Sequence, residues 1–413
     1  MSLAPPRPQH APLTQFEVVE DVLQIGGMSL ERLAQRVGST PFYALDRRSI
    51  AARAASLRTH LPADIALHFA MKANPMPAVV HLMSTLVDGI DVASGSELKV
   101  ALDAGIEPSS ISFAGPGKSN RDLGCAIASG IVINLESLHE MERVADIGLQ
   151  LGMQPLVAVR VNPDFELKSS GMTMGGGPKQ FGVDAEQVPA LLRKLGQLEL
   201  GFEGFHIYCG SQNLKATAIA EAQEKTIELA IRLAADAPSR VRTLNIGGGF
   251  GVPYFPGDTA LDLAAVGANL YRLMPRVRQS LPDARVVVEL GRYLVAEAGI
   301  YVSRVVERKV SRGQVYLVTD GGLHHHLAAT GNFGQVIRKN YPVLIGNKVR
   351  GGPREVASVV GPLCTPLDLL ADRMEMAVAG PGDLVVVLQS GAYGLTASPT
   401  AFLSHPMPLE VLV

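Results

Sequence analysis

One lysine directly follows an apolar run in the first third of the chain. The run Ala66–Met71 is short, lies between two prolines and precedes a helical pattern, as is typical of a buried strand in a parallel α/β sheet. An unpaired ammonium buried there would cost on the order of several kcal/mol. We therefore expect Lys72 to be paired, neutralised or covalently occupied, the alternative being an amine that reaches solvent at the strand end.

Other polar residues stand at or just after the ends of further predicted strands. They are Asp91, Arg160, His206, Asn245 and Glu289. In a barrel of alternating strands and helices, the carboxyl ends of all strands meet at one face, and that face holds the active site. The shared position of these residues therefore predicts one site that also contains Lys72.

A glycine-rich turn and a charged pair follow two of these strands. Gly247–Gly249 lets backbone N–H groups converge on an anion, although such a triplet also suits a tight turn between a strand and a helix. Arg292 has a planar guanidinium that matches phosphate oxygens, the alternative being a salt bridge with Glu289. A lysine, an anion site and a carboxylate that can hold a pyridinium proton are the groups that pyridoxal phosphate requires.

The composition describes a globular chain with an ample core. Of its 413 residues, 47% are hydrophobic and 18% are charged, and this length predicts two domains. The net charge of -2 and the scattered basic residues argue against nucleic acid as a partner, and no apolar stretch is long enough to span a membrane. Three dispersed cysteines predict no disulfide framework and a reducing, cytoplasmic location. We expect residues 1–13, which are rich in proline, to be loose.

The order of the predicted elements indicates the fold class, which is α/β. Strands and helices alternate with short turns from residue 66 to residue 290, and their number favours a closed TIM-type (β/α)8 barrel over an open sheet. Beyond Gly291 strand patterns dominate, which predicts a mostly antiparallel β domain. Near the N-terminus, Ser29 and Asp46 are each expected to cap a helix.

Several motifs carry a resemblance to a known family. They are Phe69–Asn74, Asp91–Leu98, Gly210–Gln212, Gly247–Phe250, Glu289–Tyr293, Gly361–Cys364 and Gly391–Gly394. From about Thr40 to its C-terminus, the chain resembles the alanine-racemase-type (fold type III) pyridoxal phosphate enzymes, and within them the diaminopimelate, ornithine and arginine decarboxylases. It looks most like divergent members that act on carrier proteins or belong to biosynthetic gene clusters.

The resemblance implies domains, a cofactor and a set of site residues. Residues 40–288 would form the barrel that binds pyridoxal 5'-phosphate, and residues 1–39 together with 289–413 would form the β domain. Lys72 would bind the cofactor as a Schiff base, Glu289 would hold the ring nitrogen, and Cys364 would reach into the partner's site of a homodimer to return a proton to the substrate. The implied cofactor contacts are Lys72, Asp91, Arg160, His206, Tyr208, Ser211, Gly248, Gly249, Glu289, Gly291, Arg292 and Tyr393.

The chain departs from the family pattern where the ring and the substrate would bind. Tyr208 stands where the family has its ring-stacking histidine, so either Tyr208 or His206 would cover the ring. Thr365 follows Cys364 where diaminopimelate and ornithine decarboxylases have an acidic residue that binds the distal amine of the substrate. Losing one partner of such a pair costs ~2–5 kcal/mol, which favours a substrate whose side chain is uncharged, acidic or tethered. The predicted substrate contacts are His324, Arg338, Tyr341, Thr365 and Asp368.

Three adjacent histidines, His324–His326, invite the interpretation of a metal site. Because alternate side chains of a strand point to opposite faces, we expect that all three cannot converge on one ion. We therefore predict no metal, and substrate contact or polar packing for these histidines. A metal-dependent barrel hydrolase would also need carboxylates in register with them, and the sequence shows none.

The predicted function is the pyridoxal-phosphate-dependent α-decarboxylation of an amino acid. The substrate would be a free diamino acid, such as diaminopimelate, ornithine or lysine, or an aminoacyl group tethered to a carrier protein. One alternative is an amino-acid racemase on the same fold, which would need a second base. Another is a non-catalytic homologue that binds the cofactor, which would have no need of Lys72, Glu289 and Cys364 together.

Overall fold

The computed structural model of the chain describes residues 9–12, 14–166, 172–173, 175–335 and 337–413. The chain divides into two compact units: unit 1 contains Met1–Ala52, Val252–Ala260 and Arg292–Val413, and unit 2 contains Arg53–Gly251 and Leu261–Gly291. Residues 40–52 and 252–260, which the sequence placed with the barrel, thus belong to unit 1. Of the N-terminal residues expected to be loose, 1–8 and 13 lie outside the described residues.

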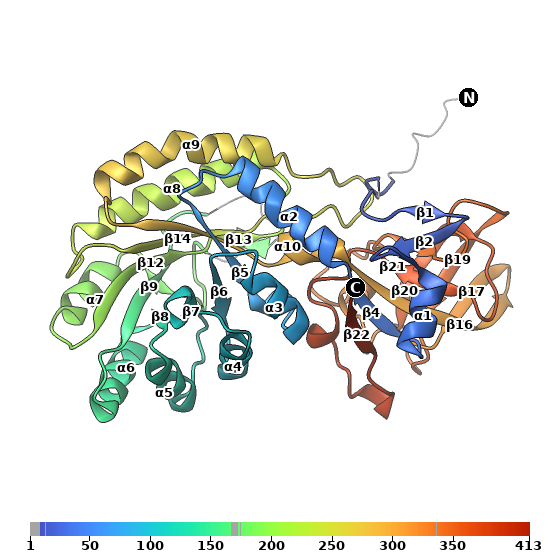
Figure 1. Ribbon diagram of the computed structural model, residues 1–413, viewed down its shortest axis with the longest axis horizontal. Coiled ribbons are helices and arrows are strands. Elements are labelled where there is room, and N and C mark those ends of the chain that lie inside the picture. Colours follow the sequence, from blue (N-terminus) through green and yellow to red (C-terminus); the bar gives the residue numbers. More distant parts are fainter. Residues whose placement is uncertain (1–8, 13, 167–171, 174, 336) are drawn as a thin grey trace. The chain divides into compact units, whose positions relative to one another are not determined.

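Unit 2 is a closed barrel of parallel strands with helices around it (Figure 1). The strand order β5-β6-β7-β8-β9-β12-β14-β15 returns on itself because β15 pairs with β5. These strands are β5 (Ala66–Ala70), β6 (Gly89–Val92), β7 (Ile111–Phe113), β8 (Val132–Leu135), β9 (Leu156–Asn162), β12 (Gly201–Ile207), β14 (Thr243–Gly248) and β15 (Arg285–Leu290). The predicted TIM-type barrel is confirmed.

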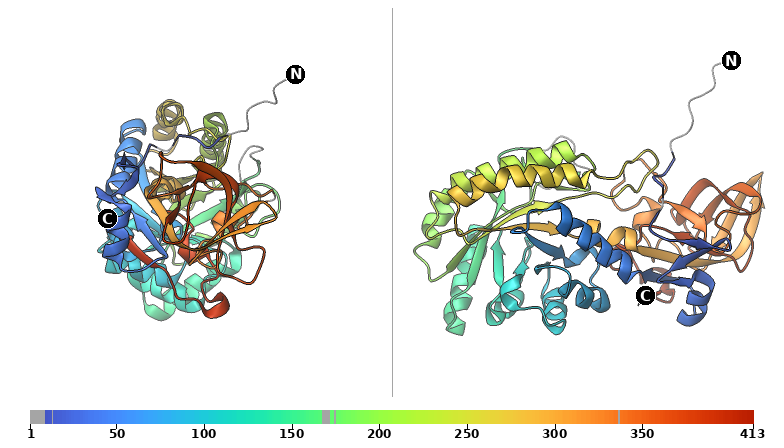
Figure 2. Two further views of the ribbon diagram at one scale, coloured as in Figure 1. Left: turned by 90° about the vertical axis from the view of Figure 1, so that its right-hand side faces the viewer. Right: turned by 45° about the horizontal axis from the view of Figure 1, so that its top comes forward.

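Helices follow most of these strands and cover the outside of the barrel (Figure 1). They are α3 (Pro77–Ser84), α4 (Gly95–Asp103), α5 (Asn120–Ser129), α6 (Leu138–Leu151), α7 (Val188–Leu195), α8 (Ala216–Ala234) and α9 (Leu263–Ser280). Both views in Figure 2 show α8 and α9 side by side, where Arg276 forms an ion pair with Glu228. Because the strands are covered on both faces, their sequences are nearly continuous apolar runs.

Unit 1 contains a mixed sheet built around one long strand, β16 (Gly299–Ser311). This strand pairs antiparallel with β4, β17 and β21, while β17 pairs parallel with β19 and β4 pairs parallel with β22. The other strands are β4 (Phe42–Leu45), β17 (Gln314–Thr319), β18 (Val343–Ile345), β19 (Arg354–Val360), β20 (Leu369–Ala377), β21 (Leu384–Val387) and β22 (Leu409–Leu412). The prediction of a mostly antiparallel β domain is confirmed.

The N-terminal segment of unit 1 follows the sequence closely. Strands β1 (Val18–Val19), β2 (Val22–Ile25) and β3 (Met28–Ser29) form a small sheet that leads into α1 (Leu30–Val37). The Ser29 hydroxyl accepts a hydrogen bond from the Arg32 N–H, and Asp46 accepts one from the Arg48 N–H at the start of α2 (Arg47–His60). Both predicted caps are confirmed. In the part of the chain that the structure describes, no helix is long and apolar enough to cross a membrane.

Candidate active site

Three neighbouring barrel strands bring predicted site residues to one end of unit 2. Strands β14, β15 and β5 are adjacent, and Gly248 lies beside Glu289 in the register of β14 and β15. The residue after β15, Gly291, lies against the turn that carries Lys72, since a Cβ on this glycine would come 2.9 Å from the Cβ of Ala73. The glycine-rich turn, Glu289 and Lys72 therefore share the carboxyl end of the barrel, where enzymes of this fold bind their substrates.

Lys72 lies just after strand β5, as the sequence predicts. Strand β5 ends at Ala70, and Lys72 belongs to the one-turn 3-10 helix η1 (Met71–Ala73), which the Asn74 N–H closes by donating to the Met71 carbonyl oxygen. The side chain is exposed, and its Nζ lies 5.7 Å from the centroid of the Tyr208 ring. Lys72 thus reaches solvent at the strand end, the alternative left open by the sequence, because the turn carries the amine out to where a small molecule can reach it.

Two glycine segments from different strands form one surface, the glycine cradle (Gly210–Ser211 and Gly247–Gly249). Gly249 has a φ of 71°, and a Cβ there would lie 2.0 Å from the carbonyl oxygen of Gly210. Asn213 joins the two segments, since its N–H donates to the Gly249 carbonyl oxygen at 2.9 Å. The cradle therefore depends on glycine for its close backbone approach, as an anion-binding loop does.

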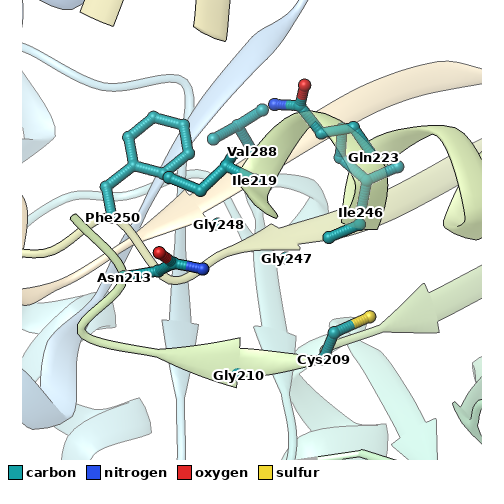
Figure 3. Close-up of a pocket in the computed structure, with 11 residues that line it drawn as sticks. Cys209, Gly210, Asn213, Ile219, Gln223, Ile246, Gly247, Gly248, Phe250 and Val288 are labelled. Carbon is teal, nitrogen blue, oxygen red and sulfur yellow. The ribbon is translucent and has the colours of Figure 1, made fainter. Parts of the chain in front are cut away.

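A small cavity lies behind the cradle, against α8 (Figure 3). Its lining includes Cys209, Ile219 and Gln223, and its volume of about 20 Å³ is room for about one water molecule. Burial raises the pKa of the Cys209 thiol to about 11, although its contact with the Thr226 hydroxyl works in the opposite direction. This cavity is too small for a cofactor, and its thiol is not a nucleophile at neutral pH.

Glu289 is buried and has two neighbours inside the barrel. Its Oε2 lies 3.1 Å from Nε2 of His206 and accepts a hydrogen bond of 3.2 Å from Nδ2 of Asn245. Burial alone would raise the pKa of Glu289, but the contact with His206 and the positive charges of Lys72 and Arg160 lower it below its usual value. Glu289 therefore keeps a negative charge in the interior of the barrel.

His206 and Tyr208, the two candidates for covering a bound ring, differ in their surroundings. The His206 ring is buried and faces Glu289, whereas Tyr208 is half-buried and lies beside the amine of Lys72. Strand β12 ends at Ile207, between the two residues. Tyr208 is therefore the candidate whose ring lies next to the lysine.

Asp91 and Arg160, two further predicted cofactor contacts, are buried and bound to neighbouring side chains. Asp91 accepts a hydrogen bond from the Ser112 hydroxyl, and its Oδ2 is buried without a hydrogen-bond partner. Arg160 donates to Oε1 of Glu136 at 2.6 Å, and its guanidinium lies 4.9 Å from the centroid of the Phe181 ring. Arg160 thus forms a buried ion pair, and its positive charge still acts on Glu289.

Arg292 and Tyr393, both predicted to contact phosphate, lie together in unit 1. The Arg292 guanidinium is 4.6 Å from the centroid of the Tyr393 ring, and its Nη1 donates to the Tyr254 hydroxyl at 3.1 Å. The Nε atom of Arg292 is buried without a hydrogen-bond partner. Tyr341, a predicted substrate contact, stacks on Tyr254 with ring centroids 4.5 Å apart. Arg292 therefore lies in a cluster with Tyr254, Tyr341 and Tyr393, and its Nε–H remains available to donate to a ligand.

The three histidines of unit 1 lie in a turn, so the strand geometry assumed for them is wrong. His324 and His325 have ring centroids only 3.6 Å apart, while Nε2 of His326 lies 2.9 Å from the Ser390 hydroxyl. Burial is the main cause that lowers their pKa values, to about 3 for His324 and His326 and to about 4 for His325. Among the described residues, no group of three metal-ligating side chains is placed to hold an ion.

The remaining predicted substrate residues surround a turn of unit 1. Cys364 is exposed, and the neighbouring Asp368 is buried, with its carboxylate accepting hydrogen bonds from the Leu323 and Leu363 N–H groups at 2.6 and 2.8 Å. Burial raises the pKa of Asp368. Arg338 donates to two backbone carbonyl oxygens, so its guanidinium is also bound to the chain. Thr365, which is half-buried, carries no charge.

Three residues of this region have contacts that the sequence did not predict, although Asn245 was already expected in the site. Asn213 joins the two parts of the cradle, Asn245 contacts Glu289, and Glu136 pairs with Arg160. Asn213 and Glu136 each had a visible signal, because Asn213 follows the Gly-Ser-Gln motif and Glu136 directly follows the strand that ends at Leu135. Their partners lie on other segments of the chain, so the sequence did not show them.

Comparison with known proteins gives one family and several relatives. Residues 47–296 match the family model described as pyridoxal-dependent decarboxylase, pyridoxal binding domain. The chain is 38% identical over 379 residues to an L-glutamyl-[BtrI acyl-carrier protein] decarboxylase from Niallia circulans, covering 90% of this chain and 88% of the relative. It is 33% identical over 401 residues to diaminopimelate decarboxylase from Aquifex aeolicus, covering 96% and 92%.

The fold is also that of a solved structure. Diaminopimelate decarboxylase from M. jannaschii, crystallised with L-lysine, matches with a TM-score of 0.88 and covers 97% of this chain and 93% of that one. At 23% identity this likeness concerns the fold alone.

Proposed function

The chain belongs to the pyridoxal-dependent decarboxylases, and from this premise we propose that it decarboxylates an aminoacyl group at a site built around Lys72. The observation that carries the proposal is the convergence of Lys72, Glu289 and the glycine cradle at the carboxyl ends of three adjacent strands. The relatives described above are named decarboxylases, which favours decarboxylation over racemisation and over a role in binding alone.

The residues present fit pyridoxal phosphate. The cradle would receive its phosphate, because a Cβ at Gly248 or Gly249 would collide with neighbouring backbone, so only glycine permits the close backbone approach that is typical of anion-binding loops. Arg292, with its buried unpartnered Nε, and Tyr393 are assigned to the same phosphate from their motifs. Ser211 and Gly291 complete the set by their places in the cradle and beside Lys72.

The cofactor, when bound, supplies a conjugated ring that takes up the electron pair left as carbon dioxide departs. Lys72 would hold it covalently through its exposed amine. Glu289 would hold the proton on the ring nitrogen, since its lowered pKa keeps the carboxylate charged. Tyr208, the aromatic side chain beside Lys72, would cover one face of the ring. Asp91 and Arg160 would support the site from the barrel interior.

Cys364 would return a proton to the substrate carbon in the site of a second copy of the chain. The thiol is exposed and lies in the Gly-Pro-Leu-Cys motif, which supports this assignment. Replacing Cys364 with Ala should leave the visible absorbance of the bound cofactor intact while slowing turnover or diverting the product.

A mixing experiment tests whether two copies share each site. When Lys72→Ala and Cys364→Ala are mixed, activity should rise above that of either variant alone, to about a quarter of the wild-type activity, because random pairing makes half of the dimers mixed and each mixed dimer has one intact site. Activity that stays at the level of the two separate variants would exclude shared sites.

The substrate side chain is proposed to lack a free distal ammonium and to arrive on a carrier protein. Thr365 is neutral, and the carboxylate of Asp368 is occupied by two backbone N–H groups, so neither supplies a charge partner for an ammonium. The relative with 38% identity acts on an aminoacyl group of an acyl-carrier protein. A free diamino acid such as diaminopimelate is the second candidate, since the relative with 33% identity acts on it.

A screen for carbon dioxide release tests the proposal. Protein supplied with pyridoxal phosphate is given free amino acids and carrier-bound aminoacyl groups, with Lys72→Ala as the inactive control. We expect release from a carrier-bound glutamyl or similar group and little from free diaminopimelate, ornithine or lysine. Loss of optical activity without carbon dioxide would instead indicate a racemase. A cytoplasmic location stays a prediction from cysteine usage.

A further inference from the structure

Glu289 makes both of its contacts inside the barrel through the same oxygen atom. His206 Nε2 lies 3.1 Å from Oε2, and Asn245 Nδ2 donates to Oε2 at 3.2 Å. The exposed fractions of His206, Asn245 and Glu289 are 3%, 6% and 6%. A carboxylate that contacts two buried side chains through one oxygen is restricted in its rotation, and its other oxygen, Oε1, is left to accept a bond from a ligand.

The barrel itself sets this geometry. Strands β12, β14 and β15 are consecutive in the barrel, and His206 lies directly beside Asn245 in their register. Asn245 is fixed in turn, because its Oδ1 accepts a hydrogen bond of 2.8 Å from the Gly247 N–H in the cradle. The orientation of Glu289 is therefore tied both to the sheet and to the loop proposed for phosphate.

The His206 ring has no other fixed partner. Both of its nitrogens are buried and neither makes a well-aligned hydrogen bond, so the contact with Glu289 is a close approach of the imidazole to the carboxylate. Lys72 and Arg160 also act on Glu289 through their positive charges, and Arg160 is bound to Glu136. His206 is thus the nearest group that can adjust the position of this carboxylate.

We propose that His206 is a positioning residue that, with Asn245, holds Oε2 of Glu289 so that Oε1 meets the ring nitrogen of the cofactor. This inference rests on the proposed function, because it needs pyridoxal phosphate to bind with its ring nitrogen toward Glu289. It assigns His206 a place behind the carboxylate and leaves the face of the ring to Tyr208.

The test compares two ligands that differ only at the ring nitrogen. One is pyridoxal phosphate and the other is its carbocyclic analogue, in which a C–H group replaces that nitrogen. Three variants are measured with each ligand by titration of visible absorbance: His206→Phe and His206→Asn, which remove the contact with Oε2, and His206→Gln, which keeps a side-chain N–H of similar reach.

His206→Phe and His206→Asn should weaken the binding of pyridoxal phosphate by about tenfold or more, the loss expected when a close polar contact to a buried charged group is removed. The same variants should bind the carbocyclic analogue within about threefold of the wild-type protein, and His206→Gln should restore most of the affinity for pyridoxal phosphate. The Asn variant preserves the test if the Phe variant does not fold.

Two results would overturn the inference. Equal weakening of both ligands would show that His206 only supports the fold, and unchanged affinity for pyridoxal phosphate would show that it does not act on Glu289. Failure of the proposed function looks different, because the wild-type protein itself would then bind neither ligand at Lys72.

Discussion

Replacing Gly249 with alanine tests the glycine cradle, on which the proposed phosphate site depends. The left-handed backbone of Gly249, with a φ of 71°, costs an alanine roughly 1–2 kcal/mol. The added Cβ would also lie 2.0 Å from the Gly210 carbonyl oxygen, against a usual minimum of 3.0 Å, so the two segments must separate. Separation strains the Asn213–Gly249 hydrogen bond, which contributes ~0.5–1.5 kcal/mol.

We therefore expect Gly249→Ala to lower the free energy of unfolding by about 1.5–3.5 kcal/mol. It should also weaken pyridoxal phosphate binding by about a hundredfold, because a shift of ~1 Å in a binding loop has an effect of this size. The matched control is Gly130→Ala: Gly130 has a φ of 70°, but an added Cβ would meet nothing within 4 Å. In this control the free energy of unfolding should fall only by the roughly 1–2 kcal/mol that an alanine in a left-handed backbone conformation costs.

The assays are denaturant unfolding and titration of visible absorbance on both variants. If Gly249→Ala behaves like Gly130→Ala in both, the close approach of the two glycine segments is not what builds the site, and our reasoning is refuted.

Three further predictions concern buried charge, pH and the thiol. Lys118→Met removes the cation that pairs with the buried Glu140 and should lower the free energy of unfolding in denaturant by ~3–5 kcal/mol. Lys99→Met, at the exposed pair with Asp103, should lower it by less than ~1 kcal/mol. Equal losses would contradict the burial argument. Burial lowers the pKa of His326 from 6.5 to about 3. Below about pH 6.5 the unfolded chain therefore binds a proton at His326 that the folded chain does not bind. The free energy of unfolding should fall there as the pH drops, by up to ~1.4 kcal/mol per pH unit. Unfolding curves between pH 7.5 and about 5 should show a shallower slope for His326→Gln, and an unchanged slope would contradict this. Cys364→Ala should alter turnover or product but not cofactor absorbance, and unchanged turnover with unchanged product would remove the thiol from the mechanism.

The fold could be predicted because each of its signals is local. The apolar runs and the helix caps, such as Ser29 and Asp46, depend on residues a few positions apart, and the structure confirms them. The chain's return to unit 1 at residues 252–260 was not predicted, because it depends on distant contacts such as the stacking of Tyr254 on Tyr341.

The candidate site could be predicted only as far as its residue types and strand ends. Lys72 was placed correctly after a strand, but a single turn closed at Asn74 decides its exposure, and a strand pattern does not show that turn. The contacts of Glu289 with His206 and Asn245 depend on the register of parallel strands whose residues are more than 40 positions apart. Such a register is fixed by packing of the whole barrel, so the sequence did not reveal it.

Covalent trapping of the cofactor tests the central claim most directly. Purified protein is incubated with pyridoxal phosphate, its visible absorbance is recorded, borohydride is added, and the labelled peptide is identified by mass spectrometry, with Lys72→Ala as the control. We predict a visible absorption band in the wild-type protein and a label fixed on Lys72, with neither in the variant. A wild-type protein without this band, or a label on some other lysine that persists in Lys72→Ala, would contradict the account.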